Sequence, residues 1–297
     1  MHAVMIIAHN QFELLKKLIL ALDDERNDIF IHIDAKVKDF DFNLFKNLTK
    51  YSKVYFTERV NVTWGDFSQV KAEMTLLSAA VNNESKGRKY SYFHLISGCD
   101  LPIKSNDEIH AFFEKNSGKE FIHFSSIEVS DSSITRIKYY HFFRNKRTFF
   151  RKLLSYSILQ FEKLARVNRL KKYNITTVQK GCNWFSITGG FARYIVQNMS
   201  KWESVFRYSY CADEVFVQTI LVNSPFKDNI YMPNCNNNHL ACARLIDWER
   251  GNPYVFRKED FDLIKSSPAM FARKFSLDVD SEIVDMILNS NIKTGNN

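Results

Sequence analysis

The stretch Tyr92-Phe93-His94-Leu95-Ile96-Ser97-Gly98-Cys99-Asp100-Leu101-Pro102 joins an apolar run to a polar corner. The run from Tyr92 to Ile96 has the length and the aromatic content of a buried strand. Strands that are apolar along their whole length are typical of parallel sheets covered by helices. The stretch therefore predicts an α/β protein in which a central strand ends at a polar corner, residues 97–102.

Three further apolar runs precede this strand, at residues 4–8, 29–33 and 54–56. Helical patterns separate them. We expect Asn10 to cap the first helix, with Glu13 as its capping-box partner, and a second helix to begin near Ser68. This β-α-β-α-β order predicts a mainly parallel, Rossmann-type sheet with helices on both faces.

The second half of the sequence is less regular. We expect Ser105 and Glu108 to form a capping box. Beyond them the pattern predicts helix over 148–172, a strand at 183–187, helices near 190–199 and 212–221, and short helices from Lys258 onward.

Composition is that of an ordinary globular protein, with 45% hydrophobic and 25% charged residues among 297. That length favours one domain, residues 1–297. The N-terminus lacks the features of a signal peptide, and no apolar run reaches about 18 residues. The cysteines are odd in number and form no CxxC pair, which indicates reduced thiols and a cytoplasmic location: Cys99, Cys182, Cys211, Cys235 and Cys242.

The net charge of +8 is concentrated in residues 136–180, which hold thirteen Lys or Arg and one acid, Glu162. This segment is also rich in aromatic residues. One interpretation is that the aromatics, Phe143 among them, cover the sheet while the cations face solvent. The alternative is that 139–172 docks on an anionic membrane surface at the inner face of the cell membrane. A nucleic-acid-binding protein is a third hypothesis, which no recognition motif supports.

Polar residues follow several of the predicted strands. His9 comes after the first strand, Asp34 after the second, and residues 97–100 after the fourth. Ligands of open α/β sheets bind beyond the carboxyl ends of the strands, so we expect a site there. Neither GxGxxG nor GxxxxGK[ST] occurs, which excludes a dinucleotide fingerprint and a P-loop.

The corner Gly98-Cys99-Asp100 stands where many enzymes that use nucleotide diphosphates carry Asp-x-Asp. One carboxylate and a thiol make a poor site for Mg²⁺ or Mn²⁺, because these ions require several oxygen ligands. We therefore predict no metal and no cofactor. Arg273 and Lys274 offer positive charge that could hold a diphosphate instead.

Several motifs together resemble the family of core-2/I-branching β-1,6-N-acetylglucosaminyltransferases and peptide O-xylosyltransferases. In chain order they are Ile6-Ile7-Ala8-His9-Asn10, Ile31-His32-Ile33-Asp34, Thr63-Trp64-Gly65, residues 95–104, Asp213-Glu214, Leu245-Ile246-Asp247-Trp248 and Phe271-Ala272-Arg273-Lys274-Phe275. The resemblance implies a GT-A-type fold with a helical basic insertion. It also implies sugar transfer with inversion and without a divalent metal.

The resemblance further implies a nucleotide-binding half at 1–125 and a catalytic, acceptor-binding half at 126–297. Glu214 would be the catalytic base. The implied ligands of the donor and its diphosphate are Arg273, Lys274, Arg244, Asp34, His9 and Asp100. Trp64, Trp248 and Asp213 would line the donor or acceptor side.

The implied donor is a UDP-sugar, first UDP-GlcNAc and second UDP-xylose. The implied acceptor is a hydroxyl of a glycan or lipid-linked glycan, as in bacterial surface polysaccharide synthesis. A catalytically silent relative that only binds the sugar nucleotide is the remaining alternative, and Glu214 with Arg273 and Lys274 argues against it.

Overall fold

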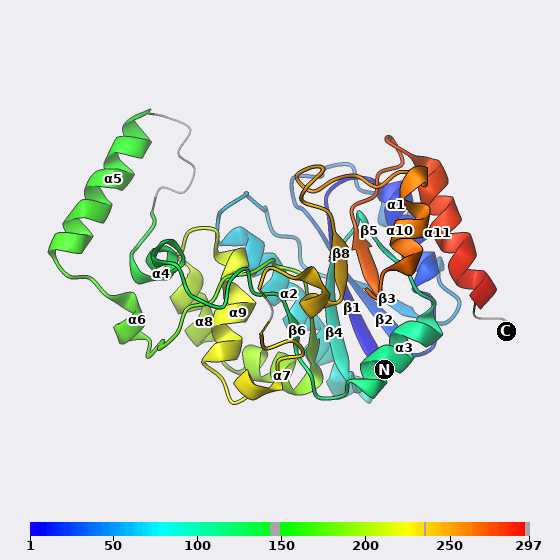
Figure 1. Cartoon of the computed structure of the whole chain (residues 1–297), viewed down its shortest axis with the longest axis horizontal. Helices are drawn as coiled ribbons and strands as arrows, with labels where there is room; N and C mark the ends of the chain where they lie inside the picture. Colours follow the sequence, from blue (N-terminus) through cyan, green and yellow to red (C-terminus); the bar gives the residue numbers. More distant parts are fainter. Residues whose placement is uncertain (143–148, 235, 295–297) are drawn as a thin grey trace.

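The centre of the computed structural model is a six-stranded sheet with the order β3-β2-β1-β4-β7-β6 (Figure 1). The structure describes residues 1–142, 149–234 and 236–294. Neighbours among the first four strands are parallel, and β7 and β6 continue the sheet antiparallel. The predicted mainly parallel α/β fold is confirmed. The strands are β1 (His2–Ala8), β2 (Asn27–Ile33), β3 (Lys53–Phe56), β4 (Tyr92–Ser97), β6 (Phe121–Ile122) and β7 (Phe185–Thr188).

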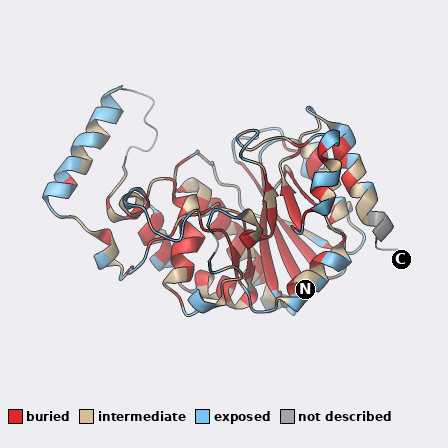
Figure 2. Ribbon diagram, viewed as in Figure 1, coloured by how far each residue is buried: buried red, intermediate tan, exposed pale blue. Residues whose placement is uncertain are grey.

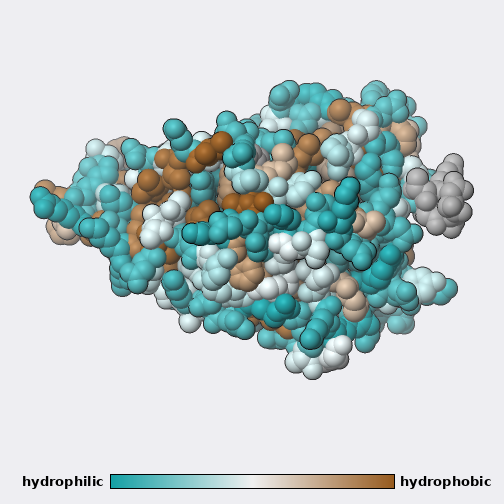
Figure 3. Space-filling view, turned by 60° about the horizontal axis from the view of Figure 1, so that its bottom comes forward, coloured by the Kyte–Doolittle hydropathy of each residue, from teal (hydrophilic) through white to brown (hydrophobic). Residues whose placement is uncertain are grey.

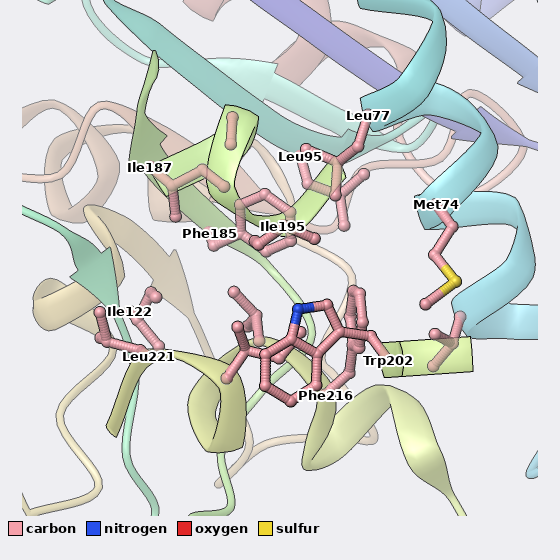
Figure 4. Close-up of a cluster of buried hydrophobic side chains, with 14 of the residues drawn as sticks. Met74, Leu77, Leu95, Ile122, Phe185, Ile187, Ile195, Trp202, Phe216 and Leu221 are labelled. Atoms are coloured by element: carbon pink, nitrogen blue, oxygen red, sulfur yellow. The ribbon is translucent and has the colours of Figure 1, made fainter. Parts of the chain in front are cut away.

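Helices cover both faces of this sheet because its strands are apolar on both sides. Along β1, Ala3 and Met5 face one hydrophobic cluster, and Val4 and Ile6 face the other. Figure 4 shows the first cluster, and Figure 2 shows the buried sheet between the helical layers. On the first face lie α2 (Ser68–Asn83), α7 (Gly189–Gln197), α8 (Met199–Phe206) and α9 (Phe216–Val222); on the second lie α1 (Phe12–Ala21), α3 (Asn106–Lys115), α10 (Phe261–Ser266) and α11 (Ser281–Thr294).

Helix starts agree only partly with the sequence patterns. The Ser105–Glu108 capping box at α3 is confirmed. The predicted cap at Asn10 is wrong, because Gln11 holds the N-cap position of α1 in the left-handed conformation and Glu13 pairs with Lys16 at 2.8 Å. The predicted helix over 212–221 is divided into a 3₁₀ turn, Ala212–Glu214, and α9.

A second, three-stranded sheet joins segments that are distant in the sequence. It has the order β5-β9-β8, formed by Asp100–Pro102, Phe271–Arg273 and Arg244–Ile246. β5 pairs antiparallel with β9, so that Asp100 stands directly opposite Arg273. The polar corner after β4 is therefore tied to the C-terminal cations by backbone hydrogen bonds.

The basic segment forms an arm that extends from the body (Figure 1). We use the term arm for residues 149–172, which contain α5 (Phe149–Leu164) and α6 (Arg169–Lys172). α4 (Asp131–Lys138) leads toward it. Buried Arg169 anchors its base by donating to the carbonyls of Ile137 and Val205 at 3.0 and 2.6 Å. Phe143, also predicted to pack on the sheet, lies outside the described residues. No helix in the described ranges is both long enough and apolar enough to cross a bilayer.

Candidate active site

A cavity of about 980 Å³ opens at the carboxyl ends of the parallel strands. His9 follows β1, Asp34 follows β2, and Ser97 ends β4, and all three line it. The strand ends thus meet at one edge of the sheet, where the sequence placed a binding site.

Asp34 shapes the cavity wall at the end of β2. Its Oδ1 accepts hydrogen bonds from the backbone N–H groups of Lys36 at 2.9 Å and Val62 at 3.3 Å. The Arg59 guanidinium donates to the carbonyls of Ile33 and Asp34. These bonds fix a loop that presents Lys36 and Asp34 together to the cavity.

Glu214 lines the same cavity from the 3₁₀ turn before α9. Arg136 approaches its Oε2 at 2.6 Å, and Lys180 approaches the same oxygen at 3.4 Å. Sequence reasoning did not assign these two cations, although they are the first and last residues of the basic segment. The first and last cations of the basic segment thus both contact the Glu214 carboxylate.

Asp213 and two residues of α2 form the floor beside Glu214. Gln69 Nε2 donates to Asp213 Oδ2 at 2.9 Å. Glu73, one turn further along α2, is 1% exposed and also lines the cavity. Burial, followed by the charge of Glu214, raises the pKa of Asp213 to about 6. Burial, with a smaller contribution from Asp213, raises the pKa of Glu73 well above its ordinary value.

Arg273 also lines the cavity, at the end of β9. Its Nη1 donates to Ser97 Oγ at 2.7 Å and to Asp100 Oδ1 at 2.8 Å. The guanidinium carbon lies 4.3 Å from the ring centre of Trp184, which is a cation–π distance. Three neighbours thus hold Arg273 against the wall, in the same cavity as Glu214.

Three predicted ligands do not reach this cavity. Asp100 is buried, its Oδ2 accepts from the Ser97 N–H at 2.8 Å, and its Oδ1 accepts from Arg273, which it positions. Arg244 is enclosed at the core, where it donates to Ser186 and to backbone carbonyls including those of Leu95 and Phe185. Lys274 follows the end of β9 and is absent from the lining, unlike the preceding Arg273.

Both predicted tryptophans stand at the cavity and are exposed, Trp64 by 78% and Trp248 by 49%. Trp248 Nε1 donates to His239 Nε2 at 3.2 Å. Large exposed aromatic rings at a cavity are suited to stacking on the apolar face of a sugar or base.

His123, Cys182 and His239 gather at the cavity with possible ligand atoms within 4.8 Å of one another. The two imidazole rings are stacked, with centroids 4.2 Å apart and planes 10° apart. A metal bound to a ring nitrogen lies in the plane of that ring, so two stacked parallel rings cannot direct their lone pairs at one ion. His123 Nδ1 also accepts from the Cys182 N–H at 3.0 Å. In this arrangement His123, Cys182 and His239 contact one another as part of the cavity wall.

Four of the cysteines are free thiols in the described structure, as the sequence suggested, namely Cys99, Cys182, Cys211 and Cys242. Cys235 lies outside the described residues.

Comparison with known proteins gives a family match over most of the chain. Residues 3–265 match the model of the Core-2/I-Branching enzyme family. Xylosyltransferase 2 of dog and of mouse are 26% and 27% identical, over 96% of this chain and 33% of each relative. The chain therefore spans about a third of the length of these curated relatives.

Two solved structures also overlap with the chain. The apo form of mouse xyloside xylosyltransferase 1 has a TM-score of 0.35 at 10% identity, covering 91% of this chain and 96% of that one. S. aureus TarS has a TM-score of 0.27 at 15% identity, covering 49% and 26%. Similarity at this level says nothing about the site.

Asp213→Asn should flatten the dependence of folding stability on pH. An acid whose pKa is higher in the folded chain than in the unfolded chain binds its proton more tightly when folded, so its contribution to stability is lost as pH rises. For Asp213 the window runs from its ordinary value of 3.8 to about 6, and the loss is on the order of 3 kcal/mol. Urea unfolding at several pH values measures it. The exposed Asp262→Asn is the control, and an unchanged slope in Asp213→Asn would contradict the assignment.

Proposed function

Because the chain belongs to the Core-2/I-Branching enzyme family, we propose that it is a glycosyltransferase that moves a sugar from a UDP-sugar to a glycan hydroxyl group, with inversion. The observation that carries the proposal is that Arg273 and Glu214 line the same cavity. We propose UDP-GlcNAc as the first candidate donor, because the resemblance of the sequence motifs implies it. The relatives named xylosyltransferase favour UDP-xylose as the second candidate.

Glu214 is the proposed base. Arg136 and Lys180 both contact Oε2, and no hydrogen bond from a described residue engages Oε1. The cations therefore orient the carboxylate and leave one oxygen for the acceptor. As the acceptor oxygen bonds to the anomeric carbon, its proton passes to Glu214. The bond from that carbon to the β-phosphate oxygen breaks, and its electron pair leaves with UDP.

Arg273 is the proposed contact for the departing diphosphate. A guanidinium fixed by Ser97, Asp100 and Trp184 needs little reorganisation when negative charge develops on the leaving group. Lys36 also lines the cavity, whereas Lys274 does not. We propose Lys36 as a second cation for the diphosphate.

We propose that the reaction requires no divalent metal. The one carboxylate of the corner, Asp100, is already bonded to Ser97 and Arg273 and does not line the cavity. The fixed guanidinium of Arg273, and not a metal ion, would then neutralise the diphosphate.

We further propose peripheral membrane contact through 139–172, close to a lipid-linked glycan acceptor. α5 exposes Phe149, Phe150, Phe161 and Leu164 on the arm, next to lysines and arginines. Figure 3 shows hydrophobic residues gathered over the left half of that view, the end that carries the arm. Apolar side chains beside cations suit the interface of an anionic bilayer.

Glu214→Gln should abolish transfer and preserve UDP binding, because the amide keeps the shape of the carboxylate and cannot accept the proton. Loss of a general base lowers the rate by roughly 10²- to 10⁴-fold. UDP release in the presence of acceptor gives the rate, and calorimetry gives UDP affinity. Exposed Glu259→Gln is the matched control. Transfer by Glu214→Gln at the control rate would refute this base.

Transfer should persist in excess EDTA, since Arg273 supplies the positive charge that a metal would otherwise provide. The measurement is UDP release before and after chelation, with Mn²⁺ and Mg²⁺ added back. Activity that disappears with EDTA and returns only with Mn²⁺ would overturn the cationic mechanism.

Replacing Phe149, Phe150 and Phe161 by Ser should weaken sedimentation with vesicles that contain anionic lipid by about tenfold or more. Each of these exposed rings would bury apolar area in the bilayer, and the serines would not. Leu263→Ser, a change at an exposed apolar residue on α10, is the control. Equal binding of the native chain to neutral and anionic vesicles would argue against electrostatic docking.

A further inference from the structure

The buried carboxyl group of Glu73, in the cavity floor, lacks hydrogen-bond partners in the described part of the chain. Among the described residues, neither of its carboxyl oxygens has a hydrogen-bond partner, and Asp213 Oδ1 also has none. A buried polar atom without a partner costs about 1–3 kcal/mol, and a native fold removes such atoms unless something requires them. Three such oxygens in one cavity wall need an explanation.

Both carboxyl groups belong to residues of the cavity wall. Gln69 and Glu73 are four residues apart on α2, so their side chains share one helix face. Gln69 binds Asp213 Oδ2 with its amide nitrogen and the Gly65 N–H with its amide oxygen, which fixes the near edge of the floor. Glu73 then stands one turn further along, and both Glu73 and Asp213 line the cavity that also holds Glu214.

The charge state suits recognition of hydroxyl groups. With burial favouring its neutral form, Glu73 carries an O–H donor and a carbonyl acceptor, and Asp213 Oδ1 is an acceptor. A sugar hydroxyl both donates and accepts, so a pair of them can satisfy all three oxygens. A phosphate cannot do this, because it brings negative charge and no donor toward Asp213 and Glu214.

We propose that Glu73 and Asp213 form a subsite for the hydroxyl groups of the sugar that is transferred. This inference rests on the proposed function. In the proposed mechanism the anomeric carbon lies between the diphosphate held by Arg273 and the base Glu214. The transferred sugar is then the part of the substrates placed beside Asp213, the neighbour of Glu214, and Glu73. Glu73 is therefore a specificity residue that holds the donor sugar and takes no part in the proton transfer.

Two variants separate this role from a structural one. Glu73→Leu keeps the approximate size and removes every polar atom, whereas Glu73→Gln keeps a donor and an acceptor. Calorimetry with UDP, UDP-GlcNAc and UDP-xylose, in the absence of acceptor, measures how much the sugar adds to affinity. Thermal unfolding measures the fold. Because no acceptor is present, transfer does not interfere.

In Glu73→Leu we expect affinity for the preferred UDP-sugar to fall by roughly 10- to 100-fold, because the hydrogen bonds to the sugar hydroxyl groups are lost. Affinity for UDP should stay the same. Its midpoint of thermal unfolding should equal or exceed the native value, since an unpartnered buried group has been removed. Glu73→Gln should stay within about threefold of native affinity.

A less stable Glu73→Leu with an unchanged preference for UDP-sugar over UDP would overturn the subsite, as would an equal loss of UDP affinity. If the native chain bound neither UDP nor UDP-sugars, the proposed function itself would fail, which is a different result.

Discussion

The pairing of β5 with β9 is the constraint on which the site depends. Asp100 and Arg273 are 173 residues apart in the chain, yet they are directly opposite in the ladder and joined by an ion pair of 2.8 Å. Asp100 is buried, so its charge requires this partner, and removing one member of such a pair typically costs 3–5 kcal/mol. One short antiparallel ladder thus places a cation from the C-terminal strand at the end of β4, where the parallel sheet opens.

The sequence contained enough information to locate the site but not to assign every role in it. Apolar runs reveal where strands end, so His9 and Asp34 could be placed on the cavity by periodicity alone. Arg244 illustrates the limit. A buried and an exposed arginine look identical in a sequence, and only the three-dimensional core shows that the carbonyls of Leu95 and Phe185 bind this one. Lys274 illustrates a second limit, because it follows the end of β9 and does not line the cavity that the preceding Arg273 lines.

Other residues were missed although their sequence patterns held a signal. Glu73 comes three residues after Val70 and four before Leu77, two apolar residues on the same face of α2, so its position on the helix already implied burial. Arg136 and Lys180 were counted only as part of a charged segment. Pairing between distant side chains depends on the tertiary fold, and no local pattern indicates that both ends of that segment meet Glu214.

The cavity must bind an anionic diphosphate beside carboxylates, and the structure separates these opposing demands in space. Arg273 and its supports stand at the strand ends, while Glu214 keeps its own cations, Arg136 and Lys180, at the 3₁₀ turn. Burial raises the pKa of Glu73 well above its ordinary value and so favours the neutral form, in which the floor gains polarity without a further negative charge. A charged Glu73 would repel both the diphosphate and Glu214. The same burial that makes this carboxyl costly to the fold therefore makes it compatible with an anionic donor.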